Sequence, residues 1–497
     1  MFVQKQDGKK KEMQERKGKC KERFCFSSEI FFEVNAAFMF CSESNKTNNR
    51  TMNTFHNNLT TSSGKMLLAV LFFLLPTVLF TGCLKDKCEQ TSAYKYFKPV
   101  YLSLSDLRKA VKTTAASDLK DVGKVYYKDQ FIYVNEINKG IHVIDNHNPS
   151  APQNIAFINI PGNVDMAVKG NILYADSYID LVAIDITNPV SVTEVNRVTE
   201  VFPERIYVNG YMGNATLGVI TDWIERDTIV TQDCNTYNGG CFFGKISGGG
   251  GIYMSEDFAS TSALSSSSTT TTTFASPGSG IAGSMARFCI YQNFLYTLDQ
   301  WQMKLFDITN TSNPIAGTTI NMSWNIETIF PYQDKLFIGS TNGVFIYDNS
   351  NPSSPAQLAQ FVHASSCDPV VVSGNYAYST LRSGTSCNGF TNQLDVIDIN
   401  NISSPVLKVS YPMTNPHGLG IDGTTLFISD NNAGLKVYDA TDPLNISLKQ
   451  TVTGMVPYDV IPINNDLIMV AEDGLYQYDY SNTSNLQLLS KVTIVKN

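Results

Sequence analysis

The sequence predicts an all-β protein: a β-propeller of seven clear four-stranded blades with a degenerate eighth. The chain has 497 residues, of which 43% are hydrophobic and 16% charged, and this composition suits a large globular core. It is rich in Tyr (24), Phe (28) and Gly (33), which favours strands and tight turns over helices. A short strand followed by a turn also recurs at intervals of about forty residues.

The recurring element is a strand that ends in aspartate. It first appears as GIHVID at 140–145, and its aspartates lie 40, 122, 41, 50, 41 and 40 residues apart, at Asp145, Asp185, Asp307, Asp348, Asp398, Asp439 and Asp479. A second strand, such as FIYVNE at 131–136, precedes each copy. Forty residues accommodate four short strands, and the connections are too short for helical crossovers, so the strands run antiparallel. Packing such sheets radially buries their faces, which fits the period better than a β-solenoid or a sandwich does.

The repeated aspartates could be interpreted as a ring of metal ligands, but the turn sequence favours a structural role. In the pattern Asp-x-x-Asn/Asp-Pro, as at 145–149 and 439–443, the carboxylate can accept a hydrogen bond from the backbone N–H two residues later. The following Asn-Pro or Asp-Pro pair then fixes the turn. Since every repeat needs the same turn, we expect these side chains to stabilise it.

An apolar run near the N-terminus predicts export. Met66–Gly82 is uncharged, follows Lys65 and contains Pro76, so it suits a signal-peptide core better than a membrane span. It ends in Phe-Thr-Gly before Cys83, which resembles a bacterial lipobox and predicts lipidation of this cysteine; a signal-anchor helix is the alternative. The chain then divides into a mis-assigned upstream extension (1–51), a lipoprotein signal peptide (52–82), a lipidated tether with a short helix (83–117) and the propeller (118–497). Ser105 is the expected N-cap of the helix.

One interval between repeats is much longer than the others. The 122 residues from Asp185 to Asp307 include strand-like segments at 204–210 and 217–223, interpreted as the eighth blade or as a decoration of its neighbour. They also include a Gly/Ser/Thr-rich insertion at 246–285, expected to be a surface loop, with a loop that orders on binding as the alternative. In an exported protein, two pairs of cysteines are expected to form disulfides: Cys234 with Cys241, and Cys367 with Cys387.

The strands LVAID, FIYD, DVID and KVYD, followed by their turns, carry a resemblance to a known family. In them the chain resembles the LVIVD-repeat proteins, secreted or lipid-anchored β-propellers of bacteria. The lipoprotein-like leader and blocks such as NPHGLGID and EDGLYQYDY are similar to the form common among Bacteroidetes-type bacteria. The resemblance spans about residues 94–497. It implies a fold and a location, and it identifies no catalytic residue.

Alignment of the repeats places a charged or titratable residue where each innermost strand begins: Lys124, Asp165, Arg205, Arg287, Glu327, Asp368, His417 and Asp459. These strand entrances converge at the mouth of the central channel. The residue types differ from unit to unit, as an asymmetric site requires, and we predict ligand binding by Asp165, Arg287, Glu327, Asp368, His417 and Asp459. The carboxylates suit a cation such as Ca²⁺ or the hydroxyls of a sugar. A solvated rim of salt bridges is the alternative.

Function is constrained by what the chain lacks and by its charge. It contains no His-Glu-x-x-His, Gly-x-Ser-x-Gly or P-loop motif. From Cys83 onward it carries 25 basic and 38 acidic residues, which argues against nucleic acid as a partner. We expect a non-enzymatic binding module, with no cofactor beyond Ca²⁺ at the channel mouth, that is lipid-anchored at the outer membrane or cell surface and binds a glycan or an envelope protein. The alternative is an extracytoplasmic hydrolase or lyase that uses a channel-mouth cation, with His417 as acid or base.

Overall fold

The computed structural model describes residues 89–207, 210–233, 281–322, 326–362, 369–383 and 391–496. The upstream extension and signal peptide, Cys83, Asp368 and the four cysteines of the expected disulfides lie outside these ranges, so those expectations stay predictions. Among the described residues, Cys289 is a buried free thiol. No helix in the described ranges is long and apolar enough to cross a membrane.

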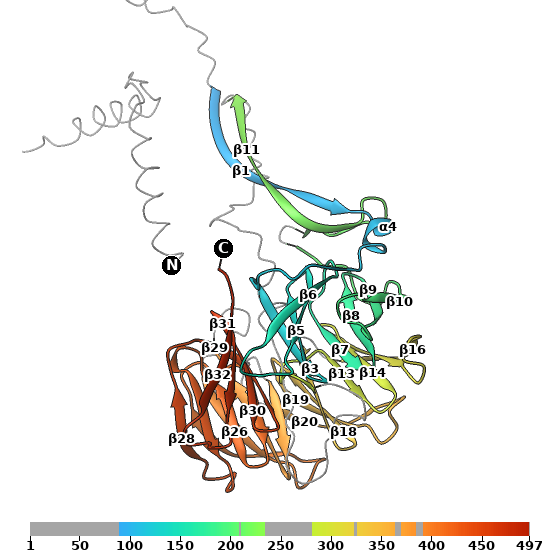
Figure 1. Ribbon diagram of the computed structural model, residues 1–497. Coiled ribbons are helices and arrows are strands. Elements are labelled where there is room, and N and C mark those ends of the chain that lie inside the picture. Colours follow the sequence, from blue (N-terminus) through green and yellow to red (C-terminus); the bar gives the residue numbers. More distant parts are fainter. Residues whose placement is uncertain are drawn as a thin grey trace, which may run out of the picture. The chain divides into compact units, whose positions relative to one another are not determined.

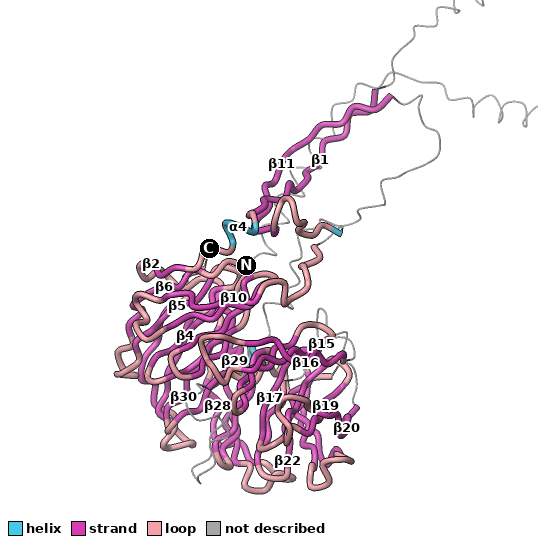
Figure 2. Tube along the Cα trace, turned by 90° about the vertical axis from the view of Figure 1, so that its right-hand side faces the viewer, coloured by secondary structure: helices cyan, strands magenta, loops and turns pink. Residues whose placement is uncertain are grey.

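Seven antiparallel four-stranded units form the blades of a propeller (Figure 1, Figure 2), as predicted. In each blade the chain runs from the innermost strand outward, and successive innermost strands contact one another around the channel. The first blade consists of β3 (Val122–Lys128), β4 (Phe131–Glu136), β5 (Gly140–Asp145) and β6 (Gln153–Asn159). The second consists of β7 (Met166–Lys169), β8 (Ile172–Ser177), β9 (Asp180–Asp185) and β10 (Thr193–Val198). The third consists of β13 (Phe288–Tyr291), β14 (Phe294–Leu298), β15 (Gln302–Asp307) and β16 (Ile315–Asn321).

The last four blades repeat the pattern with little variation in strand length. They are β17 (Ile326–Tyr332), β18 (Lys335–Ser340), β19 (Gly343–Asp348), β20 (Ala356–Val362); β21 (Val370–Ser373), β22 (Tyr376–Leu381), β23 (Gln393–Asp398), β24 (Val406–Pro412); β25 (Leu419–Asp422), β26 (Thr425–Ser429), β27 (Leu435–Asp439), β28 (Ser447–Val452); and β29 (Pro457–Ile463), β30 (Asp466–Ala471), β31 (Gly474–Asp479), β32 (Gln487–Thr493). A 3₁₀ turn, η4 (Asn431–Ala433), joins β26 to β27.

The repeated aspartates close the turns between third and fourth strands, which confirms the structural interpretation. Oδ1 of Asp145 accepts from the backbone N–H of His147 at 3.0 Å, and Oδ1 of Asp185 accepts from that of Thr187 at 2.8 Å. The equivalent bond from the N–H of Asn400 lowers the pKa of Asp398 to about 2. These carboxylates are therefore charged and engaged in their own turns, on the side of each blade remote from the innermost strand.

The core lies between neighbouring blades, where the inner three strands bury their side chains. Tyr174 of β8 and Tyr296 of β14 are fully buried and reach the turn of the following blade. Their hydroxyls donate to the carbonyl oxygens of Thr311, at 2.7 Å, and Pro352, at 2.8 Å. Each tyrosine thus combines a large apolar contact with a satisfied hydroxyl, and it ties two blades together.

The ring closes by packing between the first and last blades, each of which has four strands from its own repeat. One hydrophobic cluster contains Val125 and Ile132 of the first blade together with Val460 and Leu475 of the last. Beyond β32, Ile494 forms an isolated parallel bridge with Leu119, and both side chains belong to this cluster. The two ends of the propeller are therefore held by apolar burial plus a short backbone contact.

The expected eighth blade is not formed by the described residues. The strand predicted at 217–223 belongs to β11 (Val219–Asp233), which pairs along its whole length with β1 (Glu89–Leu102) as a two-stranded ribbon. Its only paired neighbour in the described chain is therefore the segment that precedes the propeller. The reason is that β1 supplies a long antiparallel partner, so this segment satisfies its backbone without building a sheet of four strands.

Two local expectations were wrong. The short helix expected within 83–117 is a single turn, α4 (Leu104–Leu107), and its N-cap is Ser103 instead of Ser105. Residues Lys112–Thr114 form β2, which extends the outer edge of the first blade beside β6. Residues 246–280 of the Gly/Ser/Thr-rich insertion lie outside the described residues, so the expected surface loop there stays a prediction. The end of the insertion, Ile281–Ala282 (β12), pairs with the innermost strand β3. Tertiary hydrogen bonding outweighs local preference at both places.

Candidate functional site at the propeller channel

A segment of the chain lies across the channel, and we call Ile281–Arg287 the channel segment. Its first two residues pair with Tyr126 and Tyr127 of β3. The Oγ of Ser284 accepts from the N–H of Leu419 in the sixth blade at 3.1 Å. The carbonyl of Ala286 accepts from the N–H of Ile329 in the fourth blade at 2.8 Å. Because Ser284, Met285 and Ala286 are almost fully buried, the chain itself fills this part of the channel.

Four of the predicted ring residues gather around the channel segment and are buried there. Lys124, Asp165, Arg287 and Asp459 are each no more than 7% exposed. The Nζ of Lys124 lies 3.2 Å from Oδ2 of Asp165 and donates to the carbonyl of Met285 at 2.7 Å. Burial lowers the pKa of Lys124, and the charge of Asp165 opposes that shift. The ammonium group of Lys124 is thus held between Asp165 of the second blade and the channel segment.

Asp165 is the acceptor at the centre of this group. Its Oδ1 accepts from the N–H of Met166 at 2.7 Å, and its Oδ2 accepts from the N–H of Arg287 at 2.6 Å. The side chain of Arg287 is buried, which lowers its pKa, while the nearby charge of Glu327 acts most strongly in the opposite direction. Glu327 itself is half-buried on β17. These contacts join the entrances of the second, third and fourth blades.

Asp459 completes the group from the last blade. Burial raises the pKa of this carboxyl well above its ordinary value, while the charge of Lys124 acts to lower it. Its Oδ1 is buried and has no hydrogen-bond partner among the described residues. A Cβ at Gly418 would lie only 2.0 Å from this oxygen, so glycine is required for Asp459 to occupy its position.

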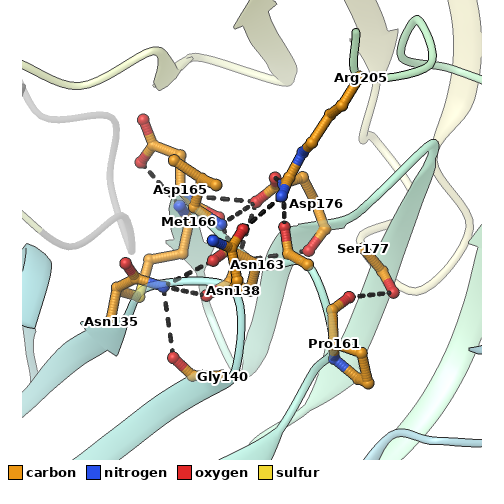
Figure 3. Close-up of polar contacts among 12 residues, drawn as sticks. Asn135, Asn138, Gly140, Pro161, Asn163, Asp165, Met166, Asp176, Ser177 and Arg205 are labelled. Carbon is orange, nitrogen blue, oxygen red and sulfur yellow. Dashed lines mark hydrogen bonds and ion pairs between the residues drawn. The ribbon is translucent and has the colours of Figure 1, made fainter. Parts of the chain in front are cut away.

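Arg205 lies in a neighbouring network rather than against the channel segment (Figure 3). Its guanidinium donates to the Oδ1 of Asn138 and to the carbonyl of Gly162, and it lies over the ring of Tyr178. Asp176 stands 3.9 Å away, and its Oδ1 accepts from Asn163 and from the N–H groups of the loop that leads to β7. The network positions Asp165, because the backbone of Asp165 is one of these donors (Figure 3).

Asp176 fixes the loop that leads to β7 by accepting its backbone N–H groups, and the sequence analysis did not predict this role. Asp299 and Asp430 directly follow the second strands of their blades, and all three residues are buried. Asp430 resembles Asp176, because it accepts from the loop before an innermost strand, at 2.8 Å from the N–H of Asn415. Asp299 instead accepts from the N–H of Gln302 in the turn that follows it. The aspartates in the segments ILYADS, FLYTLD and LFISDN are the sequence feature that could have predicted these roles. They are less evident than the aspartates of the third strands, which recur in every repeat.

His417 does not face the carboxylates. Its Nδ1 lies 3.5 Å from Nη1 of Arg382, its Nε2 lies 3.1 Å from Nδ2 of Asn431, and its ring packs edge-on against Tyr458. Burial, with a smaller contribution from the charge of Arg382, lowers the pKa of His417 to about 3. The imidazole is therefore neutral at physiological pH. Since Arg382 and Asn431 both present N–H groups, the ring accepts a hydrogen bond from only one of them, because a neutral imidazole has one acceptor nitrogen.

The geometry brings Asp165, Arg287, Glu327 and Asp459 together, with Lys124 among them. It separates them from Arg205 and His417, and Asp368 lies outside the described residues. In the ranges that the structure describes, no three His, Cys, Asp or Glu side chains are grouped so that they could hold a metal ion. Chemically, the arrangement places buried positive and negative side chains around the backbone of the channel segment, where their charges balance one another.

Family comparison finds the LVIVD repeat in three segments, residues 162–200, 333–361 and 365–413. These segments fall in the second, fourth and fifth blades. The chain carries LVIVD repeats. No curated protein sequence matches the chain.

Several solved structures are similar in fold at low identity. A protein from Lactobacillus plantarum has a TM-score of 0.47 at 13% identity, with 76% of this chain and 97% of that chain covered. BamB from Moraxella catarrhalis has a TM-score of 0.42 at 8% identity, with coverage of 78% and 96%. PorZ, a surface component of the type-IX secretion system of Porphyromonas gingivalis, has a TM-score of 0.40 at 11% identity, with coverage of 76% and 39%. Structural similarities with TM-scores this low support no conclusion about function.

Replacing Ser284 by alanine should destabilise the propeller. The substitution leaves the buried N–H of Leu419 without its acceptor, at a cost of about 1–3 kcal/mol. Urea unfolding followed by tryptophan fluorescence measures the change. Ser354→Ala, at an exposed position of a turn, is the matched control and should change stability by no more than about 0.5 kcal/mol. Equal effects of the two substitutions would show that the channel segment does not brace the ring.

Stability should fall as the pH drops below 6.5, in part through His417. The unfolded chain binds a proton at this residue near pH 6.5, whereas the folded chain does so only near pH 3. The contribution is therefore complete above 6.5 and is lost progressively between 6.5 and 3. His417→Gln should show a shallower decrease of the urea midpoint between pH 7 and 4. Superimposable pH profiles of the two proteins would contradict the assignment.

Proposed function

We propose that this chain is a lipid-anchored, extracytoplasmic β-propeller that serves the cell envelope as a non-enzymatic interaction module. The observation that carries the proposal is the closed channel. Lys124, Asp165, Arg287 and Asp459 are buried against the chain's own segment. A small ligand would have to displace the channel segment to reach these side chains, so the outer surface of the propeller is the favoured site of recognition.

The two faces of the propeller differ in regularity. The turns between first and second strands always have two residues. The turns between third and fourth strands always have seven residues and follow the repeated aspartate. The connections at the opposite face contain the departures: the chain between β10 and β13, and the eleven residues between Leu381 and Gln393. Variation confined to the connections of one face is the usual sign that this face makes the specific contacts.

Exposed apolar side chains near the base of the ribbon favour a protein as the partner. Ile206, Tyr211, Met212 and Leu217 are between 42% and 71% exposed. We call these four residues the apolar patch. Tyr211 is oriented by an edge-on contact with Trp223 of β11. Of the acidic residues beside Trp223, Asp222 is exposed and Glu225 is paired with Lys95. An apolar contact surface, as on an envelope protein, complements this patch better than a glycan does.

Lipid attachment is tested at the predicted acceptor. Cys83→Ser should move the chain from the membrane fraction to the soluble extracytoplasmic fraction, because both acyl chains needed for stable anchoring are lost. Fractionation and metabolic labelling with a fatty acid measure the change in a host that lipidates exported proteins. Unaltered membrane partition, or a wild-type chain that takes up no label, would contradict lipidation.

Partner binding is tested at the apolar patch. Met212→Asp should reduce capture of envelope proteins by the purified chain at least tenfold and leave its melting temperature nearly unchanged, since Met212 is exposed. Ile315→Asp is the control, because this residue is at least as exposed, at 58% against 46% for Met212, but lies on an outer strand of the third blade. Quantitative mass spectrometry of the captured proteins compares the three chains. Equal capture by Met212→Asp and wild type would exclude the patch.

A further inference from the structure

We propose that Lys124 and Asp165 are joined by an isopeptide bond that forms spontaneously in the folded chain and links the first two blades at the channel. The inference is independent of where the protein resides and of its partner. It rests on the geometry of the buried Lys124–Asp165 pair, with the buried carboxyl of Asp459 near enough for its charge to act on Lys124.

The pair is unusual in how completely it is enclosed. The side chains of Lys124 and Asp165 are 4% and 5% exposed, with Nζ and Oδ2 3.2 Å apart. In two other lysine pairs with a buried aspartate, Lys304 with Asp299 and Lys436 with Asp430, the lysine remains 16% and 17% exposed. A solvated ammonium keeps its proton, whereas an enclosed ion pair bears the full cost of desolvating two charges. Condensation to a neutral amide removes that cost.

The carboxyl of Asp165 is arranged as the electrophile. Its Oδ1 is held by the N–H of Met166 at 2.7 Å, which stabilises negative charge on this oxygen when Nζ adds to Cγ. Its Oδ2, the oxygen next to Nζ, is the leaving oxygen. Lys124 is itself fixed by its bond to the carbonyl of Met285, so the nucleophile and the carbon that it attacks are held in place before reaction.

The reaction balances without any added reagent. One ammonium proton passes to Oδ2 of Asp165, and the freed amine attacks Cγ. The carboxyl of Asp459 donates its proton to the leaving oxygen and accepts a proton from the nitrogen, directly or through one water. The C–N bond forms, the C–O bond breaks, and one water leaves. Two features suit Asp459 for this relay: its buried Oδ1 has no partner among the described residues, and burial raises its pKa, which favours the protonated form that can donate.

The product should be visible in a tryptic digest of the full-length chain. Trypsin cannot cleave after an acylated lysine, so residues 121–128 should remain one peptide, joined to the peptide of residues 140–169 that contains Asp165. The branched species should be lighter than the sum of its parts by the mass of one water. Cleavage after Lys304 and Lys436 should be normal, which controls for incomplete digestion.

Two variants separate the roles of the three residues. Lys124→Arg keeps the positive charge but has no amine that can attack, so the branched peptide should be absent. Asp459→Asn keeps both joined residues and should lower the yield of the bond at least tenfold, since the proton relay is lost. An unchanged yield in Asp459→Asn would exclude Asp459 from the reaction. Recovery of the wild-type chain with Lys124 fully cleavable and the 140–169 peptide unmodified would overturn the proposal, whether or not either variant folds.

Discussion

The innermost strand of each blade begins at the same narrow channel. Side chains and backbone groups there are shielded from water, so they must form hydrogen bonds with one another. The channel segment meets this constraint by bonding to several blades at once. Ser284 accepts from the sixth blade, Ala286 from the fourth, and Met285 from Lys124 of the first. A buried backbone group without a partner costs about as much as a lost hydrogen bond, so the blades are held in mutual register by this single piece of chain.

The charges at the channel follow from the same constraint. Asp165 receives two backbone N–H groups and the ammonium of Lys124, and it is itself positioned by the network around Asp176 (Figure 3). A buried ion pair contributes little net stability unless its remaining hydrogen bonds are made, and here both oxygens of Asp165 accept N–H groups while Lys124 donates to Met285. The arrangement therefore orders the entrances of adjacent blades.

The ribbon of β1 and β11 shows how a sequence pattern can be identified correctly as strand and still be assigned to the wrong sheet. Residues 217–223 alternate as a strand should, and β11 includes most of them. Periodicity states that a segment is extended and which side chains share a face. It does not state the partner, and the partner is β1, more than a hundred residues earlier in the chain. The two-residue offset between Ser103 and Ser105 as N-cap arises similarly, since the end of β1 sets where α4 can begin.

The sequence by itself determined the propeller, its seven regular blades and the role of the repeated turn aspartates, because these depend on local patterns that recur every forty residues. It also placed Asp165, Arg287, Glu327 and Asp459 near one another, since a common register implies a common position in the ring. Only the tertiary structure decided that these residues enclose Ile281–Arg287, that His417 turns to Arg382 and Asn431, and that 219–233 pairs with β1. The reason is that each of these outcomes depends on contacts between distant segments whose geometry has no counterpart in local residue spacing.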